Sequence, residues 1–310
     1  MENKKMSNFN IKKILILFYE FCYEKKRIYI LRLRYRLRIM SPDRTIKYIK
    51  KNNCSIARFG DGEFDLIFKK RDLHFQNQSN NISTGLKNVL QNKNKNLLIC
   101  IPRCMNTTLG CNNHSKTFWI EWGKNNHHQE IVDMLRNYVG KNYLFGDSQI
   151  SRPYIDWKNS KRAKRTFPKL KKLWSNKNII IVEGEQTRLG VGNDLFDNAT
   201  SIKRILTPAI NAFDYYDNIF EEIIKNRLNE ELIIMAIGPT ATVLASDLSK
   251  LNIQAIDIGN IDIEYEWYIR RAKKREAIPG KFTNEANDGR VYTSCNNKKY
   301  LCEIICKIGC

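Results

Sequence analysis

The sequence predicts an α/β fold in which a largely parallel sheet is flanked by helices. Short apolar runs bounded by turn residues recur along the chain, and segments with the apolar spacing of helices separate them. This alternation favours parallel strands, because parallel neighbours need a crossover connection that is usually a helix. The predicted strands are 54–59, 97–101, 179–182, 232–237 and 253–258, and the predicted helices include 131–138, 219–228 and 241–251.

A single α/β domain is expected to begin near residue 41. Ser41 is a suitable N-cap, Pro42 suits the first helical position, and Asp43 suits the first turn of a helix. The chain has 310 residues with 42% hydrophobic content, enough for one sizeable core, and it shows no internal repeat. The predicted division is a basic amphipathic extension over 1–40, a catalytic domain over 41–285 and a Cys-rich tail over 286–310.

The formal net charge of +21 implies an acidic partner, and much of it lies at the N-terminal end. Residues 1–53 hold fifteen Lys or Arg and four Asp or Glu. The apolar run at 14–19 is far too short to span a bilayer, and no signal cleavage site follows it. Two interpretations of 1–40 stay open: an extension that lies on an anionic membrane surface, or a helix packed on the core with a solvated basic face.

The nine cysteines predict neither a disulfide framework nor a zinc finger. Their number is odd and their spacings match no common zinc signature, so reduced thiols and a cytoplasmic location are expected. The tail holds Cys295, Cys302, Cys306 and Cys310, the last three of which would share one face if the tail were helical.

Three of the predicted strands are followed by loops rich in glycine, acidic and amide residues. These loops are 60–63, 183–194 and 238–242. Because ligands of parallel α/β sheets bind outside the carboxyl ends of the strands, the three loops are expected to meet at a ligand crevice.

The first loop contains an acidic pair suited to a hard cation. Asp61 and Glu63 can present two carboxylates to one Mg²⁺ or Mn²⁺, while the backbone at Gly60 comes close to a diphosphate. A solvated turn without function is the alternative. Arg58 precedes the loop and adds a positive charge.

The other two loops resemble phosphate-binding segments at helix starts. Gly190, Gly192, Asn193 and Asp194 could expose N–H groups to a phosphate, with Arg188 meeting its negative charge. A dinucleotide fingerprint is not supported, because the third glycine is missing. In the third loop, Gly238 and Thr240 could either cap a helix or contact phosphate.

An acidic stretch follows the last predicted strand. Four acids lie within 257–266, and Glu264 or Glu266 could act as a general base on an acceptor hydroxyl. Tyr265, Trp267 and Tyr268 could offer stacking faces to a sugar or a base. An exposed acidic strand is the alternative. None of the four histidines lies in these loops, so a His-centred mechanism has little support.

Taken together, several blocks of the sequence resemble a bacterial glycosyltransferase family with the GT-D fold, formerly a domain of unknown function. The blocks include SIARFGDGEF, FGDSQISRPY, the segment from IIIVEGEQTRLGVGND, IIMAIGPTATVLASDLSKLNIQAIDIGNIDIEYEW and GKFTNE. They run in order over most of the chain. The resemblance implies a Rossmann-like sheet, a nucleotide-sugar donor and a D-x-E motif, here Asp61 and Glu63, that holds Mn²⁺ or Mg²⁺. The implied donor-binding positions are Arg58, Gly60, Asp147, Ser151, Arg152, Glu185, Arg188, Gly190, Gly192, Asn193, Asp194, Gly238, Thr240, Asp257 and Asn260.

One departure from the family affects the expected catalysis. Asn260 stands where the family commonly has His, which would leave proton transfer to Glu266 or Glu264. The resemblance implies transfer of a hexose, from UDP-glucose or UDP-galactose, to a glycan, lipid-linked or glycoprotein acceptor in bacterial surface polysaccharide or glycoprotein synthesis. A cytoplasmic enzyme is expected, with a peripheral position on the inner membrane face left open.

Two other functional classes are set against this interpretation. A nucleic-acid-binding protein would suit the charge and the eight bases within 158–172, but these bases do not interleave with aromatic residues, and no nucleic acid is expected. A metal-dependent phosphohydrolase could use Asp61 and Glu63, but the additional His and Asp ligands of such sites are missing from the loops.

Overall fold

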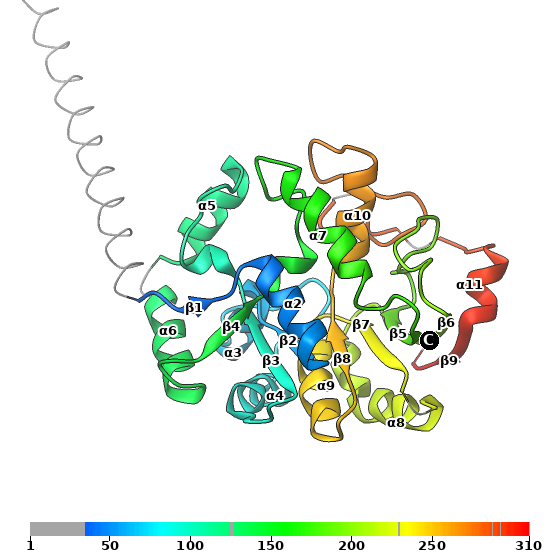
Figure 1. Cartoon of the computed structure of the whole chain (residues 1–310), viewed down its shortest axis with the longest axis horizontal. Coiled ribbons are helices and arrows are strands. Elements are labelled where there is room, and N and C mark those ends of the chain that lie inside the picture. Colours follow the sequence, from blue (N-terminus) through cyan, green and yellow to red (C-terminus); the bar gives the residue numbers. More distant parts are fainter. Residues whose placement is uncertain (1–34, 125–126, 229, 287, 292, 310) are drawn as a thin grey trace, which may run out of the picture.

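The computed structural model describes residues 35–124, 127–228, 230–286, 288–291 and 293–309. Within this part, nine parallel strands form one sheet in the order β1-β4-β3-β2-β8-β7-β5-β6-β9 (Figure 1). The strands are β1 Arg38–Ile39, β2 Ser55–Arg58, β3 Leu97–Ile101, β4 Leu144–Asp147, β5 Asn178–Gly184, β6 Ser201–Thr207, β7 Leu232–Ala236, β8 Ala255–Asp257 and β9 Ile304–Lys307.

Helices cover both faces of this sheet. The α-helices are α2 Pro42–Asn52, α3 Asp61–Ile67, α4 Asn80–Gln91, α5 Asn113–Trp122, α6 His127–Tyr138, α7 Lys161–Lys171, α8 Tyr216–Asn226, α9 Pro239–Lys250, α10 Ile261–Ile269 and α11 Lys298–Glu303. Three short 3₁₀ turns, Arg103–Met105, Ser148–Ser151 and Ala212–Tyr215, lie in the connections. The predicted α/β class with a parallel sheet is confirmed, and each of the five predicted strands is present.

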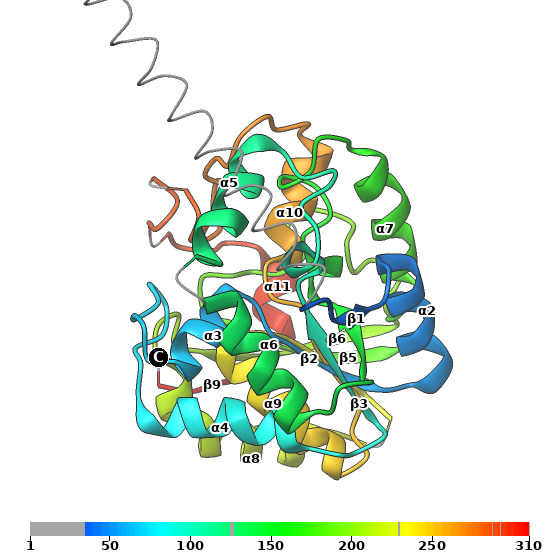
Figure 2. The same cartoon turned by 90° about the vertical axis from the view of Figure 1, so that its left-hand side faces the viewer.

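The core consists of two large apolar clusters, one on each face of the sheet. Successive residues of β5 alternate between them: Ile180 and Val182 face the cluster that contains α4, α6, α8 and α9, whereas Ile179 and Ile181 face the cluster that contains α2, α7 and α10. Because side chains on both faces of the sheet are buried, the sequences of the central strands are continuous apolar runs. Figure 2 shows α2 and α7 on one side of the sheet and α4, α8 and α9 on the other.

The predicted helix start at Ser41 is confirmed. The Ser41 side chain accepts a hydrogen bond of 3.3 Å from the Arg44 N–H, and Pro42 occupies the first helical position. Ile46 and Ile49 are buried, as the apolar spacing of the segment requires.

The sheet extends past both ends of the range 41–285. β1 pairs with β4, and β9 pairs with β6. Cys302 lies in α11 and Cys306 in β9, so these two residues do not share a helix face; Cys310 lies outside the described residues. The predicted extension over 1–40 also lies almost wholly outside them. Every helix in the described part of the chain is too short or too polar to cross a bilayer.

Candidate active site

A cleft of about 440 Å³ opens at the carboxyl ends of the strands. Its lining comes from the segments that follow β2, β3, β4, β5, β6, β7 and β8, together with parts of α5 and of the chain between 275 and 285. β2 pairs with β3 on one side and with β8 on the other, and the chain leaves β2 toward β3 and β4 before it returns to build the other half of the sheet. The cleft therefore lies at a topological switch point, where open α/β sheets bind ligands.

Arg58 and Asp257 join the two strands that meet at this switch point. The Arg58 Nη2 donates to Asp257 Oδ1 at 2.7 Å, and its Nε donates to the Asp257 carbonyl oxygen at 2.8 Å. Its Nη1 also donates to Ser151 Oγ at 2.7 Å, so the guanidinium links β2, β8 and the turn after β4. Asp257 is buried and Arg58 lines the cleft.

Gly259 is required for this arrangement. Its φ of +48° is a conformation that favours glycine, and a Cβ at this position would lie 2.1 Å from Nη2 of Arg58. The sequence alone gives no reason to single out Gly259, because the overlap that a side chain there would cause involves Arg58, about two hundred positions earlier.

Asp61 and Glu63 lie in the first turn of α3, directly after β2, and both line the cleft. Glu63 Oε2 accepts a hydrogen bond of 2.6 Å from the Gly60 N–H, and Asp61 Oδ2 forms an ion pair of 3.2 Å with Arg71 Nη2. Burial, together with the nearby charge of Asp257, raises the pKa of Glu63 to about 7, and burial also raises the pKa of Asp61. A carboxylate pair with raised pKa values is stabilised in its ionised form by an added cation.

Asp61 and Glu63 are suited to hold a divalent cation whose other ligands come from a bound phosphate group and water. No cluster of three or more His, Cys, Asp or Glu suited to a metal ion occurs among the described residues. Two carboxylates on one helical turn nevertheless match the usual way in which proteins hold Mg²⁺, by one or two carboxylates with substrate phosphates and water as the other ligands.

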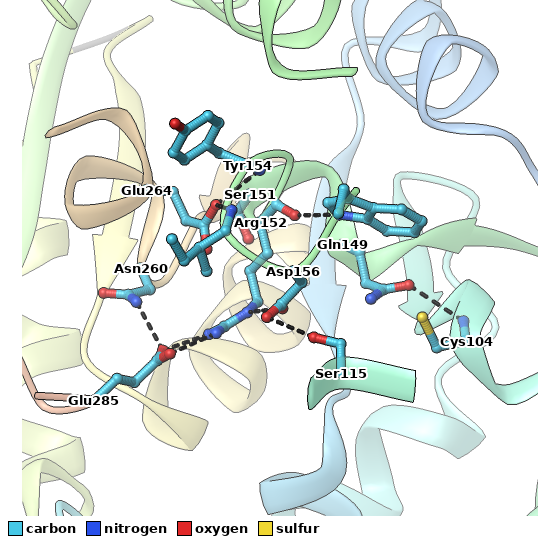
Figure 3. A network of polar contacts seen from close by, with 12 residues as sticks. Cys104, Ser115, Gln149, Ser151, Arg152, Tyr154, Asp156, Asn260, Glu264 and Glu285 are labelled. Atoms are coloured by element: carbon cyan, nitrogen blue, oxygen red, sulfur yellow. Dashed lines mark hydrogen bonds and ion pairs between the residues drawn. The ribbon is translucent and has the colours of Figure 1, made fainter. Parts of the chain in front are cut away.

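A network of two arginines, Arg152 and Arg275, and two carboxylates, Asp156 and Glu285, lines another part of the cleft. Figure 3 shows Arg152, Asp156 and Glu285 of this network. Arg152 donates to both oxygens of Glu285, at 2.6 and 2.7 Å, and to Asp156 Oδ2 at 3.3 Å. Arg275 contacts Asp156 at 2.7 Å and Glu285 at 3.1 Å. Asn260 Nδ2 donates to Glu285 Oε1 at 2.9 Å.

The electrostatics of this network keep its carboxylates ionised. Burial acts to raise the pKa of Asp156, but Arg152 and Arg275 outweigh burial and lower it to about 2. In the same way Arg152 and Arg275 hold the pKa of Glu285 below its ordinary value against the effect of burial. The two arginines are thus fixed in place by their partners and line the cleft with donors suited to phosphate oxygens.

The predicted phosphate-binding loop over 188–194 is occupied by the protein's own carboxylates. The Gly190 N–H donates to Asp262 Oδ1 at 2.9 Å, and Asn193 Nδ2 donates to Asp262 and Glu266 at 2.8 and 2.7 Å. No helix starts there, because residues 185–200 form turns that lead into β6. The expected helix start is therefore wrong. In addition, acidic side chains of α10 accept hydrogen bonds from the N–H groups that a phosphate would need.

Arg188 does not line the cleft either. Its guanidinium, which is buried, donates to the Gly280 carbonyl oxygen at 2.6 Å, to Thr293 Oγ1 at 3.0 Å and to Gln186 Oε1 at 3.1 Å. Arg188 has a φ of +51° and ties the loop to the C-terminal segment. These hydrogen bonds account for the position of the Arg188 side chain without a bound phosphate.

The two predicted general bases, Glu264 and Glu266, do not line the cleft. Both lie on α10, which is a buried helix and not an exposed strand. Glu266 accepts hydrogen bonds from Asn193, Lys281 and Arg270, which together hold its pKa below its ordinary value against burial.

Glu264 Oε2 accepts from the N–H groups of Tyr154 and Ile155, at 2.9 and 3.1 Å (Figure 3). Burial raises the pKa of Glu264 to about 8. Glu264 therefore holds the segment that carries Arg152 and Asp156, next to the cleft wall.

The aromatic residues of the cleft also differ from those predicted. Trp267 is fully buried, Tyr265 is nearly so, and Tyr265 and Tyr268 pack against Phe167. The rings that line the cleft instead are Phe59, Phe75, Phe118, Trp119, Phe282 and the imidazole of His74.

The structure thus divides the predicted site residues into three sets. Those that line the cleft are Arg58, Gly60, Asp61, Glu63, Arg152, Gly238 and Asn260. Those that contact or position these residues are Asp147, Ser151 and Asp257, of which Asp147 accepts from the Gln149 N–H at 3.0 Å and pairs with Arg162. Those outside the lining are Glu185, Arg188, Gly190, Gly192, Asn193, Asp194, Thr240, Glu264 and Glu266.

Sequence reasoning missed several cleft residues, among them Arg71, His74, Asp156, Arg275 and Glu285. Most of them lie in irregular segments with no glycine-rich signature. For Glu285 one signal existed, because it ends the GKFTNE block that carries part of the family resemblance.

Comparison with protein families gives a match over most of the chain. The model described as "Glycosyltransferase GT-D fold" matches residues 56–286. This range includes the cleft segments after every strand from β2 to β8.

Two curated relatives are each 33% identical to this chain. Glycosyltransferase GlyD of Streptococcus pneumoniae aligns over 273 residues, which cover 88% of this chain and 33% of that protein. Probable glycosyl transferase Gly of Streptococcus gordonii aligns over 275 residues, which cover 88% of this chain and 39% of that protein. The chain thus spans between a third and two fifths of the length of these relatives.

Solved structures agree with the family match. A structure of domain of unknown function 1792, described as having a distinct glycosyltransferase fold, has a TM-score of 0.82 at 36% identity and covers 92% of this chain and 100% of that one. A glycosyltransferase of the same domain class from Streptococcus sanguinis has a TM-score of 0.79 at 32% identity, with coverage of 88% and 100%. The chain belongs to the family of glycosyltransferases with the GT-D fold.

Proposed function

We propose that this protein is a metal-dependent glycosyltransferase that transfers a hexose from a nucleotide-diphosphate sugar to a glycan acceptor. The observation that carries the proposal is the cleft at the switch point, in which Asp61 and Glu63 face a lining that includes Arg58, Arg152 and Arg275. A diphosphate needs both features at once, namely carboxylates for a bridging cation and fixed guanidinium donors for its remaining oxygens.

Asp61 and Glu63 are the residues that would hold the cation. When bound, Mn²⁺ or Mg²⁺ supplies positive charge to the diphosphate that leaves in the transfer. Arg152 and Arg275 are positioned by Glu285 and Asp156 before any ligand arrives, so their charge is available to the leaving group without reorganisation. The cleft rings, Phe118 and Trp119 among them, offer stacking faces for the base or the sugar.

Glu285 is the proposed acceptor of the proton from the attacking hydroxyl. It lines the cleft, it is ionised at neutral pH because its pKa is lowered, and Asn260 orients it through a hydrogen bond of 2.9 Å. Glu266 is a poorer candidate, because it does not line the cleft. Asn260 then has a positioning role at the place where the family commonly has His.

The donor and acceptor classes follow from the family resemblance. UDP-glucose and UDP-galactose are the proposed donors, and a glycan on a lipid carrier or a glycoprotein of the bacterial surface is the proposed acceptor. We place the reaction in the cytoplasm, at the inner face of the membrane, with the basic residues of 1–40 contacting anionic lipid. The similarity to streptococcal glycosyltransferases supports the reaction class.

Incubation of the purified chain with UDP-glucose or UDP-galactose, with and without Mn²⁺, tests the proposal. Release of UDP should depend on the metal, and Asp61→Asn or Glu63→Gln should reduce it by at least 100-fold while thermal unfolding changes little, because both side chains lie at the cleft surface and not in the core. Full turnover by either variant at low Mn²⁺ would refute the metal assignment. If no nucleotide sugar released its nucleoside diphosphate, with or without a glycan acceptor, the transferase assignment would be refuted.

A further inference from the structure

Helices α2 and α7 carry a concentrated positive charge on one flank of the molecule. Residues 42–52 and 161–172 contain eleven Lys or Arg and a single acidic residue, Asp43. We call the outer surface of these two helices the α2–α7 face. The exposed bases on it are Arg44, Lys47, Lys50, Lys51, Lys161, Lys164, Arg165 and Lys172.

The two helices form one continuous surface. Ile46 and Ile49 of α2 share an apolar cluster with Phe167 and Leu170 of α7, so both helices rest on the same side of the sheet (Figure 2). An ion pair of 2.8 Å between Lys169 and Asp43 links them directly. Because the apolar stripes face inward, the exposed bases of both helices point to the same flank.

Most of this charge is uncompensated. Arg162, Lys169 and Lys171 pair with Asp147, Asp43 and Asp194. Within the part of the chain that the structure describes, the eight exposed bases form no ion pair with a carboxylate. A surface of this kind attracts anions strongly.

A pocket of about 510 Å³ lies beside the C-terminal ends of α2 and α7. Lys50, Lys172 and Lys177 line it, and so do the amides of Asn53 and Gln254, while no described carboxylate does. Lys177 Nζ donates to Gln254 Oε1 at 3.1 Å and to Asn53 Oδ1 at 3.3 Å, so its ammonium is held half-buried within the pocket. Three ammonium groups around one hollow suit the phosphate of a lipid headgroup.

We infer that the α2–α7 face docks this protein on an anionic lipid bilayer, with a headgroup phosphate in the pocket of Lys50, Lys172 and Lys177. The thirty-four residues before Tyr35 add nine Lys or Arg and three acids, and Tyr35 is only seven residues from the start of α2. Tyr48 of α2 is 38% exposed among the bases, where an aromatic ring suits the headgroup region. No residue of α2 or α7 lines the cleft, so docking on this face leaves the cleft open to substrates.

A bilayer is favoured over nucleic acid as the partner. Proteins bind single-stranded nucleic acid with Lys and Arg side chains interleaved with exposed aromatic rings, on which the nucleobases stack. Of the two aromatic residues on α2 and α7, Phe167 is buried and Tyr48 alone is exposed, so the face lacks a row of rings on which successive nucleotides could stack. This inference deepens the membrane part of the proposed function, and binding to vesicles can be measured without any sugar transfer.

The test is co-sedimentation of the full chain with vesicles of phosphatidylcholine alone or mixed with phosphatidylglycerol. Binding should require phosphatidylglycerol and should weaken in 0.5 M salt, because salt screens exposed charges. The charge-reversal variant K164E/R165E/K172E should lower the partition coefficient at least 100-fold, since each base near an anionic surface contributes roughly fivefold. The matched control K87E/K225E/K250E makes the same change in net charge on α4, α8 and α9, the opposite side of the sheet, and should bind within a few-fold of the wild type.

Equal binding by the wild type and K164E/R165E/K172E would overturn the inference, because residues 1–34 would then suffice. An equal loss in both triple variants would also overturn it, since net charge and not the face would be responsible. Binding to single-stranded RNA but not to vesicles would reassign the face to nucleic acid. Donor turnover, measured in parallel, reports on the cleft alone: vesicle binding that depends on the α2–α7 face would stand even if no turnover were found.

Discussion

At the scale of single residues, the cleft depends on how Arg58 is held at the switch point. Its guanidinium has partners on β8 and on the turn after β4, and Gly259 leaves the space in which it lies. Because an added methyl group would overlap with Nη2, Gly259→Ala should displace Arg58. We expect a loss of at least tenfold in affinity for UDP with Mn²⁺ and a decrease of about 1–3 kcal/mol in the free energy of unfolding.

Gly192→Ala provides the matched control for that change. Gly192 also has a positive φ, of +82°, but nothing lies within 4 Å of its added Cβ. Calorimetry should therefore find UDP affinity reduced in Gly259→Ala and preserved in Gly192→Ala. Equal affinities in the two variants would remove Arg58 from the donor site, whereas a loss in Gly192→Ala would return the loop over 188–194 to it.

Glu285→Gln tests the proposed proton acceptor. The amide keeps a similar shape but cannot take a proton, so the rate of transfer should fall at least 100-fold at saturating donor, with a smaller change in UDP affinity. Glu266→Gln should leave the rate within about tenfold and should instead lower the unfolding temperature, because Lys281 and Arg270 lose a charged partner. The reverse pattern would assign proton transfer to Glu266.

Glu264 gives the fold a specific pH dependence. Its pKa rises from an ordinary value of 4.5 to about 8 in the folded state, mainly because of burial. The folded state therefore keeps the proton over a range in which the unfolded chain releases it, and this group's contribution to stability is complete below pH 4.5 and is lost as the pH rises toward 8. Thermal unfolding of the wild type and Glu264→Gln between pH 5 and 8 should show a steeper fall in the wild type; parallel curves would contradict a neutral Glu264.

At the scale of elements, local sequence determined the central strands but not the edges of the sheet. β3, β5, β7 and β8 are largely buried and lie within short apolar runs of the sequence, and this pattern predicts strands without further information. β6 carries Lys203 and Arg204 in its middle, and β1 has two residues, so neither has a pattern that stands out. Their pairing depends on neighbours that are distant in the sequence.

For the candidate site too, local sequence predicts some loops correctly and others incorrectly. The loop at 60–63 was predicted with its strand, turn and helix because all three are local. The loop over 188–194 has a similar composition, but Asp262 and Glu266 on α10 occupy its N–H groups, and only the tertiary structure brings them there. Glycine-rich composition alone cannot distinguish the two cases.

Substitution of Arg188 tests whether this residue stabilises the fold or binds the diphosphate. Its guanidinium joins the loop after β5 to Gly280 and Thr293, with hydrogen bonds from a charged donor that contribute about 1.5–3 kcal/mol each. Arg188→Ala should lower the free energy of unfolding by a few kcal/mol and change UDP affinity less than threefold. Arg188→Lys should be nearly as destabilised, because a single ammonium cannot reach all the acceptors. A large loss of UDP affinity in Arg188→Ala, restored in Arg188→Lys, would favour the diphosphate role instead.

At the scale of the whole molecule, the two functions proposed lie on different surfaces. The cleft gathers the carboxyl ends of seven strands, whereas the α2–α7 face occupies one flank and contributes nothing to the cleft lining. The net charge of +21 predicts an acidic partner but not where it binds. The fold separates this charge into arginines fixed by carboxylates inside the cleft and exposed, uncompensated bases outside it.

The most direct test of the central claim is a crystal structure of the protein with UDP and Mn²⁺. In the proposed donor site the cation contacts Asp61 and Glu63, and the diphosphate lies in the cleft within reach of Arg152 or Arg275. A diphosphate bound instead at Gly190 and Arg188, with Asp61 and Glu63 making no contact with cation or ligand, would contradict it.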